Sequence, residues 1–158
     1  MRLVIVRHGK AEADSESGRD EDRRLRKRGE RQARWLGEYF RARAPALILT
    51  SGHERARATA TIIHERTGVP LTIERRLELG HSASHALDAV ADHQTSDDGG
   101  LMVVGHNPQL GQLVWILTQG PPVESASLRT GEAVELEIDP ADPLGRAALL
   151  ARVRLDED

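Results

Sequence analysis

The chain has 158 residues, 39% hydrophobic and 30% charged, a balance that predicts one folded domain over residues 1–158 with a buried core. It has no cysteine, which excludes disulfides and cysteine nucleophiles. Its net charge of −3 provides no basic field to attract nucleic acid, and its 3% of aromatic residues leaves few side chains on which bases could stack. No apolar run approaches the roughly 20 residues that cross a bilayer and charge interrupts the N-terminus too early for a secretory signal, so we expect a cytoplasmic protein without a membrane partner.

The first quarter of the chain predicts a strand, a loop and a helix. Residues 3–6 form a continuous apolar run that ends in Arg7-His8-Gly9, which is typical of a strand buried on both faces and followed by a tight turn. The polar residues 12–29 predict a surface loop. Residues 30–43 predict a helix, because apolar side chains recur there every three or four positions.

Residues 47–49 predict a second strand, and Ser51 opens the next helix. Ser51 and Glu54 have the spacing of a capping box, in which the serine side chain satisfies free backbone donors at the helix start. Gly68 is typical of a helix end. Residues 71–73 then predict a weak third strand.

The second half repeats the pattern of the first strand. A short helix is predicted around Leu87 and Val90, and the residues 97–100 predict a break in regular structure. Residues 101–104 predict another buried strand, which ends in Gly105-His106-Asn107-Pro108. A helical apolar face follows over residues 110–117, with the proline near its first turn.

The C-terminal part alternates apolar and charged residues. The stretch 134–138 carries acidic residues at alternate positions and the stretch 151–155 carries arginines, which predicts an antiparallel pair at a sheet edge. We expect the acidic and basic rows to face each other across this pair. The alternation of strands and helices in the rest of the chain predicts an α/β fold with a largely parallel central sheet.

Four residues at the ends of these elements predict an anion site. Ligands of open α/β sheets bind beyond the carboxyl ends of the strands, where His8 and His106 lie. If their two strands are neighbours, both imidazoles face one crevice. Arg7 precedes His8, and Arg55 lies in the first turn of the helix after the second strand. Such a cationic, donor-rich site suits a phosphoryl group.

Glycines next to both histidines add to this expectation. Gly9 and Gly105 would let a ligand come close to the backbone, because glycine has no side chain.

The same residues predict a two-step hydrolysis. A neutral imidazole is a competent nucleophile, and its usual pKa of about 6.5 leaves it mostly neutral at neutral pH. Nearby guanidinium groups disfavour the imidazolium further. His8 would attack phosphorus while Arg7 and Arg55 hold the nonbridging oxygens, and water would then release phosphate from His8.

Three motifs together resemble the histidine phosphatase superfamily, which has the phosphoglycerate mutase-like fold. They are Arg7-His8-Gly9 after the first strand, Ser51 through Ala60 around Arg55, and Gly105-His106-Asn107-Pro108. The short chain and the last motif are most similar to the SixA-type phosphohistidine phosphatases, and the resemblance runs from residue 1 to about residue 138. It implies a three-layer sandwich, in which helices flank a mostly parallel sheet with an antiparallel edge strand near the C-terminus.

The resemblance also implies residue roles. His8 would be the phosphorylated nucleophile, while Arg7, Arg55 and His106 would form the phosphate pocket. Arg23 matches a further phosphate-binding arginine in the family's loop. No metal or other cofactor is implied.

Three positions depart from the family pattern. Gly52 replaces the usual proline after the serine of the second motif, and Arg26 replaces a threonine that could cap the following helix, which predicts a frayed helix start. Mutase-like relatives protonate the leaving oxygen with a glutamate after the third strand, for which Glu78 is the candidate acid. SixA-type relatives do not reliably carry an acid there. An alkoxide needs a proton donor more than a leaving imidazole does, so a missing acid favours phosphohistidine.

We therefore expect a metal-independent phosphatase, a monomer that acts on a phosphohistidine-bearing protein. Two alternatives remain: a small-molecule phosphomonoesterase or mutase that uses the same site, and a catalytically silent module that binds phosphorylated ligands. The charges around Arg23 are interleaved in sign, which favours a solvated face. His81 and His85 have the spacing of metal ligands on a helix, but the sequence shows no third ligand.

Overall fold

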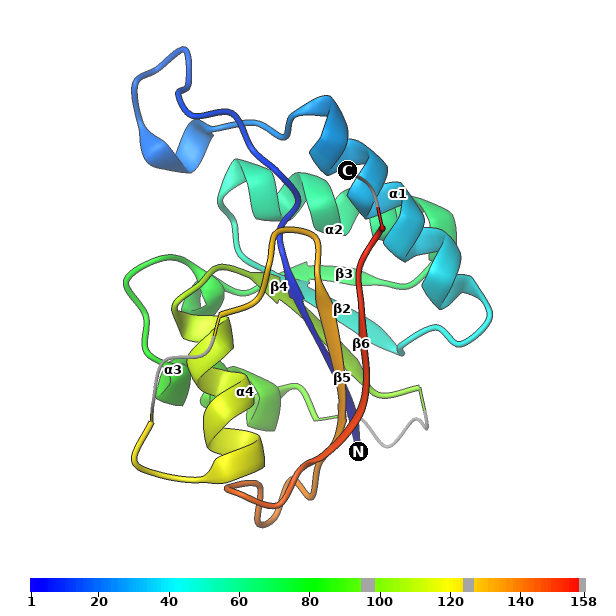
Figure 1. The fold of residues 1–158 in the computed structure, drawn as a ribbon, viewed down its shortest axis with the longest axis vertical. Coiled ribbons are helices and arrows are strands. Elements are labelled where there is room, and N and C mark those ends of the chain that lie inside the picture. Colours follow the sequence, from blue (N-terminus) through cyan, green and yellow to red (C-terminus); the bar gives the residue numbers. More distant parts are fainter. Residues whose placement is uncertain (95–98, 124–126, 157–158) are drawn as a thin grey trace.

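The computed structural model describes residues 1–94, 99–123 and 127–156 (Figure 1). Six strands form one sheet in the order β3-β2-β4-β1-β5-β6. They are β1 (Arg2–Arg7), β2 (Leu47–Thr50), β3 (Leu71–Ile73), β4 (Leu101–Gly105), β5 (Ala133–Glu137) and β6 (Ala148–Val153). The first four run parallel, whereas β5 is antiparallel to β1 and β6 is antiparallel to β5. The predicted mostly parallel sheet is confirmed.

Helices cover both faces of the sheet, so the predicted three layers are confirmed as well (Figure 1). One face carries α1 (Lys27–Arg41) and α2 (Glu54–Thr67), and the other carries α3 (Ala83–Asp92) and α4 (Gln109–Gln119). Two short 3-10 turns complete the elements, η1 (Asp20–Asp22) and η2 (Arg75–Leu77). Within the described residues, no helix is both long and apolar enough to cross a bilayer.

Strand β1 shows why the apolar runs are continuous. Leu3 and Ile5 pack into the core against α3 and α4, while Val4 and Val6 pack into the core against α1 and α2. Successive side chains of a strand point to opposite faces, so a strand with helices on both sides needs apolar residues at every position. The prediction of a strand buried on both faces is confirmed.

The start of α2 differs from the prediction. The helix begins at Glu54 with His53 as its N-cap, and that cap makes no side-chain hydrogen bond. The capping box predicted for Ser51 is therefore wrong, because the chain needs two more residues to turn from β2 into the helix. The Ser51 hydroxyl instead accepts the backbone N–H of His53 at 3.1 Å.

Two other predicted boundaries differ or fall partly outside the described chain. Helix α1 begins at Lys27, three residues earlier than predicted, and Arg26 at its N-cap forms no side-chain cap. Of the predicted break at residues 97–100, the first two lie outside the described residues. Gly100 takes a φ of 75°, which favours glycine.

The antiparallel pair β5–β6 is confirmed, but the predicted pairing of its charges is wrong. Val134 lies opposite Arg152 in the register, and cross-strand partners share a face of the sheet. The acidic row of β5 and the arginines of β6 therefore lie on opposite faces. Arg152 pairs instead with Glu132 at 3.2 Å.

Candidate active site

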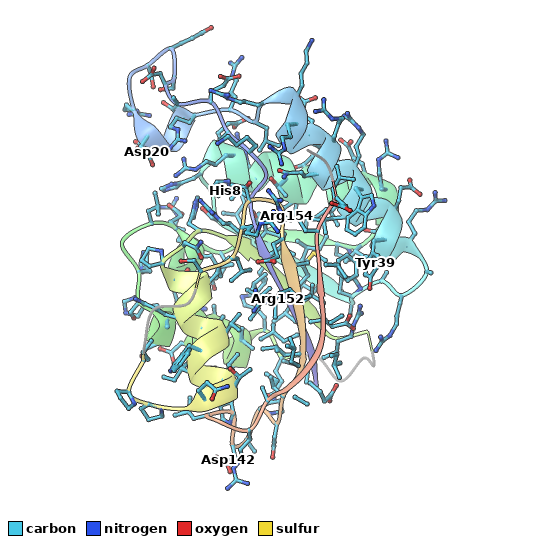
Figure 2. The ribbon with its side chains drawn as sticks, in the orientation of Figure 1. His8, Asp20, Tyr39, Asp142, Arg152 and Arg154 are labelled. Carbon is cyan, nitrogen blue, oxygen red and sulfur yellow. The ribbon has the colours of Figure 1, made fainter. Side chains whose placement is uncertain are left out.

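The two motif histidines meet at the carboxyl ends of β1 and β4. These strands are neighbours, with Arg7 opposite Gly105 in the register, as the interpretation of a shared crevice required. The ring centroids of His8 and His106 are 5.2 Å apart, and both residues are buried. Figure 2 shows His8 at the end of β1, below the projecting loop that carries Asp20.

The hydrogen bond of His8 determines which of its nitrogens is basic. Its Nδ1 lies 2.8 Å from the carbonyl oxygen of Gly9. A carbonyl oxygen only accepts, so Nδ1 carries the proton and Nε2 keeps its lone pair. Burial, followed by the charges of Arg55 and Arg7, lowers the pKa of His8 to about 4. The ring is therefore neutral at neutral pH, and Nε2 is available as a nucleophile.

His106 is also held neutral. Burial, followed by the neighbouring His8 and Arg55, lowers its pKa to about 2. Its Nε2 lies 2.8 Å from the hydroxyl of Ser51, whereas its buried Nδ1 has no hydrogen-bond partner among the described residues. Buried polar groups are rarely left unsatisfied, so Nδ1 is suited to contact a bound group.

Two guanidiniums complete the cationic part of the site. Arg7 donates from one terminal nitrogen to the carbonyl of Leu128 at 3.0 Å, and its buried Nε has no partner among the described residues. Burial and the nearby charge of Arg55 lower the pKa of Arg7. Arg55 lies in the first turn of α2, as predicted, and is buried. The repulsion between two close guanidiniums favours an anion beside them.

The loop before α1 reaches the site through Asp20. Arg55 donates to both the backbone carbonyl and the carboxylate of Asp20, at 2.8 and 2.9 Å. Arg23 donates to the other carboxylate oxygen at 3.0 Å. The Arg23 hydrogen bond is the main cause of the lowered pKa of Asp20. The carboxylate of Asp20 is half exposed, so this face is solvated as predicted, and Asp20 also binds the buried Arg55.

The two motif glycines serve the packing of the chain. A Cβ at Gly9 would lie 2.6 Å from the carbonyl oxygen of Gly29, and one at Gly105 would lie 3.2 Å from that of Leu77. The expectation that these glycines make room for a ligand is therefore wrong, since neighbouring backbone already fills the space. The Gly9 N–H is bound by the Thr59 hydroxyl at 3.0 Å.

A third histidine of the site, His53, was not predicted from the sequence. The ring centroid of His53 lies 5.1 Å from that of His106, and its Nε2 lies 3.7 Å from Oε1 of Glu78. The buried Nδ1 of His53 has no partner among the described residues. The signal was present, because His53 stands inside the second motif, two residues before Arg55. The structure thus places Glu78, the candidate acid, beside this imidazole.

A fourth arginine was missed for a different reason. Arg154 follows β6 and donates to the Thr130 carbonyl at 2.7 Å. Its charge contributes to the lowered pKa of Arg7. No motif marks this residue, because its position depends on the path of the C-terminal strand.

The arrangement suits a tetrahedral oxyanion. Within the site, three buried nitrogens have no partner among the described residues: Arg7 Nε, His53 Nδ1 and His106 Nδ1. The neutral imidazole of His8, with one basic nitrogen, lies next to His106 and beside arginines that can hold negative oxygens. Among the residues that the structure describes, no group of three or more His, Cys, Asp or Glu side chains is arranged to hold a metal ion.

Comparisons with known proteins place this chain among phosphatases of one superfamily. A family model of the histidine phosphatase superfamily (branch 1) matches residues 3–80. The structure of the protein histidine phosphatase SixA complexed with tungstate has a TM-score of 0.83 and 19% identity, covering 98% of this chain and 97% of that one. A protein assigned as SixA of Agrobacterium tumefaciens has a TM-score of 0.79 and 23% identity, covering 96% of each chain. At these identities the structures share the fold.

Curated relatives match over a smaller part. A glucosyl-3-phosphoglycerate phosphatase of Mycolicibacterium vanbaalenii is 38% identical over 82 residues, which are 51% of this chain and 36% of the relative. The chain spans 36% and 62% of the lengths of the curated relatives that it matches.

Proposed function

Because this chain belongs to the histidine phosphatase superfamily, we propose that it is a phosphatase that transfers a phosphoryl group to Nε2 of His8 and then to water. The observation that carries the proposal is the Nδ1–H hydrogen bond from His8 to the Gly9 carbonyl, next to His106 and two arginines. It leaves one unprotonated nitrogen near the positive charges of Arg55 and Arg7.

The two steps follow from this geometry. In the first, the Nε2 lone pair forms a bond to phosphorus as the bond from phosphorus to the leaving group breaks. Arg7 and Arg55 hold the nonbridging oxygens. The negative charge on these oxygens grows little in the transition state, so catalysis depends on how closely the two guanidiniums are placed to them. In the second, water attacks phosphorus and the N–P bond breaks, which returns neutral His8 and releases phosphate. His106 would contact the phosphoryl group through Nδ1.

We propose phosphohistidine on a protein as the substrate. The N–P bond of phosphohistidine breaks with less demand for an acid than a P–O ester bond does. The similarity in fold to SixA structures covers nearly the whole chain, which supports the same substrate class. Arg23 would act on the phosphate indirectly. It donates a hydrogen bond to the Asp20 carboxylate, which in turn accepts one from Arg55.

A second candidate is a small-molecule phosphomonoesterase or mutase on the same site. Glu78 lies beside His53 at the edge of the site, where a proton donor for an alkoxide is needed. The curated relative named glucosyl-3-phosphoglycerate phosphatase supports the same alternative.

Turnover of a phosphohistidine-bearing protein, p-nitrophenyl phosphate and glucosyl-3-phosphoglycerate by the purified protein tests the proposal. We expect the highest kcat/KM for phosphohistidine. Much faster hydrolysis of either ester would contradict the protein substrate. A brief reaction with a labelled phosphodonor, quenched in alkali to preserve the phosphoramidate, should label the wild type. Absence of both label and turnover would favour a binding module.

A further inference from the structure

The space beside the site on the side of β3 is a groove with His53 on its wall. Gly52, Ile73, Arg75 and Glu78 also line this groove. It lies where residues after β2 and β3 come together, next to His106. A leaving group in this groove would lie beside His53, whose ring is 5.1 Å from that of His106.

We propose that His53 is the acid that protonates the leaving group and the base that then activates water, with Glu78 as the residue that positions its imidazole. This rests on the proposed phosphatase function and adds to it the proton transfer at the leaving group.

The position of His53 supports this role. Its ring lies as close to His106, at 5.1 Å, as His8 does at 5.2 Å. The three imidazoles thus form a chain with His106 in the middle. The side chain of His53 is only 17% exposed, which removes most competing water from the imidazole. The imidazole of His53 therefore lies next to a residue of the predicted phosphate site.

The two nitrogens of His53 have different surroundings. Nε2 lies 3.7 Å from Oε1 of Glu78, so the carboxylate favours a proton on that nitrogen. Nδ1 is buried and has no partner among the described residues. Leaving a buried nitrogen unsatisfied costs free energy. If Nδ1 carries the proton that is transferred, the leaving group becomes the hydrogen-bond partner that this nitrogen lacks.

Glu78 is better placed to hold His53 than to act alone. Its contact of 3.7 Å is with the imidazole, and a Cβ at Gly52 would lie 3.3 Å from its Oε2. Glycine at position 52, where the family has proline, therefore gives the carboxylate room beside His53. An ordinary imidazole also exchanges its proton near neutral pH, whereas an ordinary carboxyl group does not.

The proton balance closes over the two steps. His53 starts as the imidazolium and gives its Nδ1 proton to the leaving oxygen or nitrogen as Nε2 of His8 bonds to phosphorus. Neutral His53 then takes a proton from the water that attacks the phosphorus of phospho-His8. Phosphate leaves, His8 returns to its neutral form and His53 returns to the imidazolium. Glu78 stays ionised throughout.

The charges around His53 bear on which leaving groups the groove accepts. The ionisable groups that line the groove with His53 are Glu78, Glu54, Arg57, Arg75, Glu21 and Asp22, and the ring of His106 lies 5.1 Å from that of His53. Among these lining groups the carboxylates outnumber the arginines. This balance favours an uncharged or cationic leaving group over an anionic one.

The test compares the variant His53→Gln with wild type on aryl and alkyl phosphates of graded leaving-group basicity. We expect kcat/KM to fall about 100-fold to 1,000-fold for an alkyl phosphate and less than about threefold for 2,4-dinitrophenyl phosphate, whose leaving group needs no proton. For the latter substrate kcat should fall and labelled phospho-His8 should accumulate, because the base for water is lost. Exposed His85→Gln is the matched control and should match wild type.

Glu78→Gln tests the positioning role. Without the carboxylate that lies 3.7 Å from its Nε2, the imidazole loses the contact that positions it, so kcat/KM should fall for alkyl phosphates and stay within about threefold for 2,4-dinitrophenyl phosphate. Glu78→Asp should restore part of the activity, and exposed Glu65→Gln is the matched control.

Equal losses on all substrates in His53→Gln, or no loss on any, would overturn the acid–base role while the phosphatase function stands. If wild type fails to cleave even 2,4-dinitrophenyl phosphate and takes no label, the proposed function itself fails and the role of His53 fails with it.

Discussion

Two of the histidine pairs in the described residues, His8–His106 and His81–His85, have nearly the same separation and very different surroundings. The rings of His8 and His106 are 5.2 Å apart, and those of His81 and His85 are 5.1 Å apart. The first pair is buried among arginines. In the second, at the start of α3, His85 is exposed, His81 is half-buried and the two Nδ1 atoms are 3.1 Å apart.

The comparison shows that proximity alone does not make a site. Burial and positive charge lower the pKa values of His8 and His106, so both rings are ready as neutral groups beside an anion. The nitrogens of the second pair face each other and open solvent, with no arginine bound to either ring among the described contacts. The difference arises from the elements that cover each pair, not from the spacing of the histidines.

The largest effect is expected when the nucleophile of the buried pair is removed. The variant His8→Ala should lose labelling by a phosphodonor and lose turnover by at least about 1,000-fold, because no other group can form the covalent intermediate. Alkali-stable incorporation of label, followed over time, measures this. Substantial labelling of the variant would place the nucleophile elsewhere.

A smaller effect is expected when Arg55 becomes lysine. Arg55→Lys keeps the charge but loses the two hydrogen bonds that the guanidinium donates to Asp20. It also loses the planar group that can bind two phosphoryl oxygens at once. We expect kcat/KM to fall about 10-fold to 100-fold. Steady-state kinetics on one substrate measure the loss, and unchanged kinetics would show that Arg55 only anchors the loop.

The lowered pKa of His8 makes the stability of the fold depend on pH. The pKa of His8 in the folded protein is about 4, below its usual value, so the unfolded chain binds the proton more tightly. Stability is therefore lost as pH falls from about 6.5 towards 4. The variant His8→Asn lacks this titrating group and should not lose that stability. When the pH is lowered from about 7 to about 4.5, its free energy of unfolding should therefore rise by about 2 kcal/mol relative to that of wild type. Urea titrations at both pH values measure it, and a constant difference would contradict the lowered pKa.

The smallest effect is expected at the second pair. The double variant His81→Ala, His85→Ala should keep kcat/KM within about twofold of wild type, because surface substitutions away from a site rarely matter. The same assay used for His8→Ala applies. A large loss would mean that α3 contributes to substrate binding.

Much of the fold was predictable from local patterns. The continuous apolar runs predicted β1 and β4, and residues 71–73 coincide with β3. Helix starts were less accurate, since α2 begins at Glu54 without the Ser51 cap. The charge pairing of β5 and β6 failed because it depends on the register, and a shift of one residue moves every side chain to the other face.

Within the site, the motif residues His8, Arg7, Arg55 and His106 were identified from their places at strand and helix ends, and the structure brings them together. Their catalytic roles stay predictions. Asp20 was hidden among exposed charges, and it contacts Arg55 across 35 positions of the chain.

The sequence by itself determined which strands are buried on both faces and which residues stand at their carboxyl ends, because these depend on the periodicity of neighbouring residues. Only the tertiary structure decided that Asp20 binds Arg55 and that His53 meets Glu78 beside His106. Those contacts join distant segments whose meeting depends on strand order and loop path. Local periodicity does not encode either one.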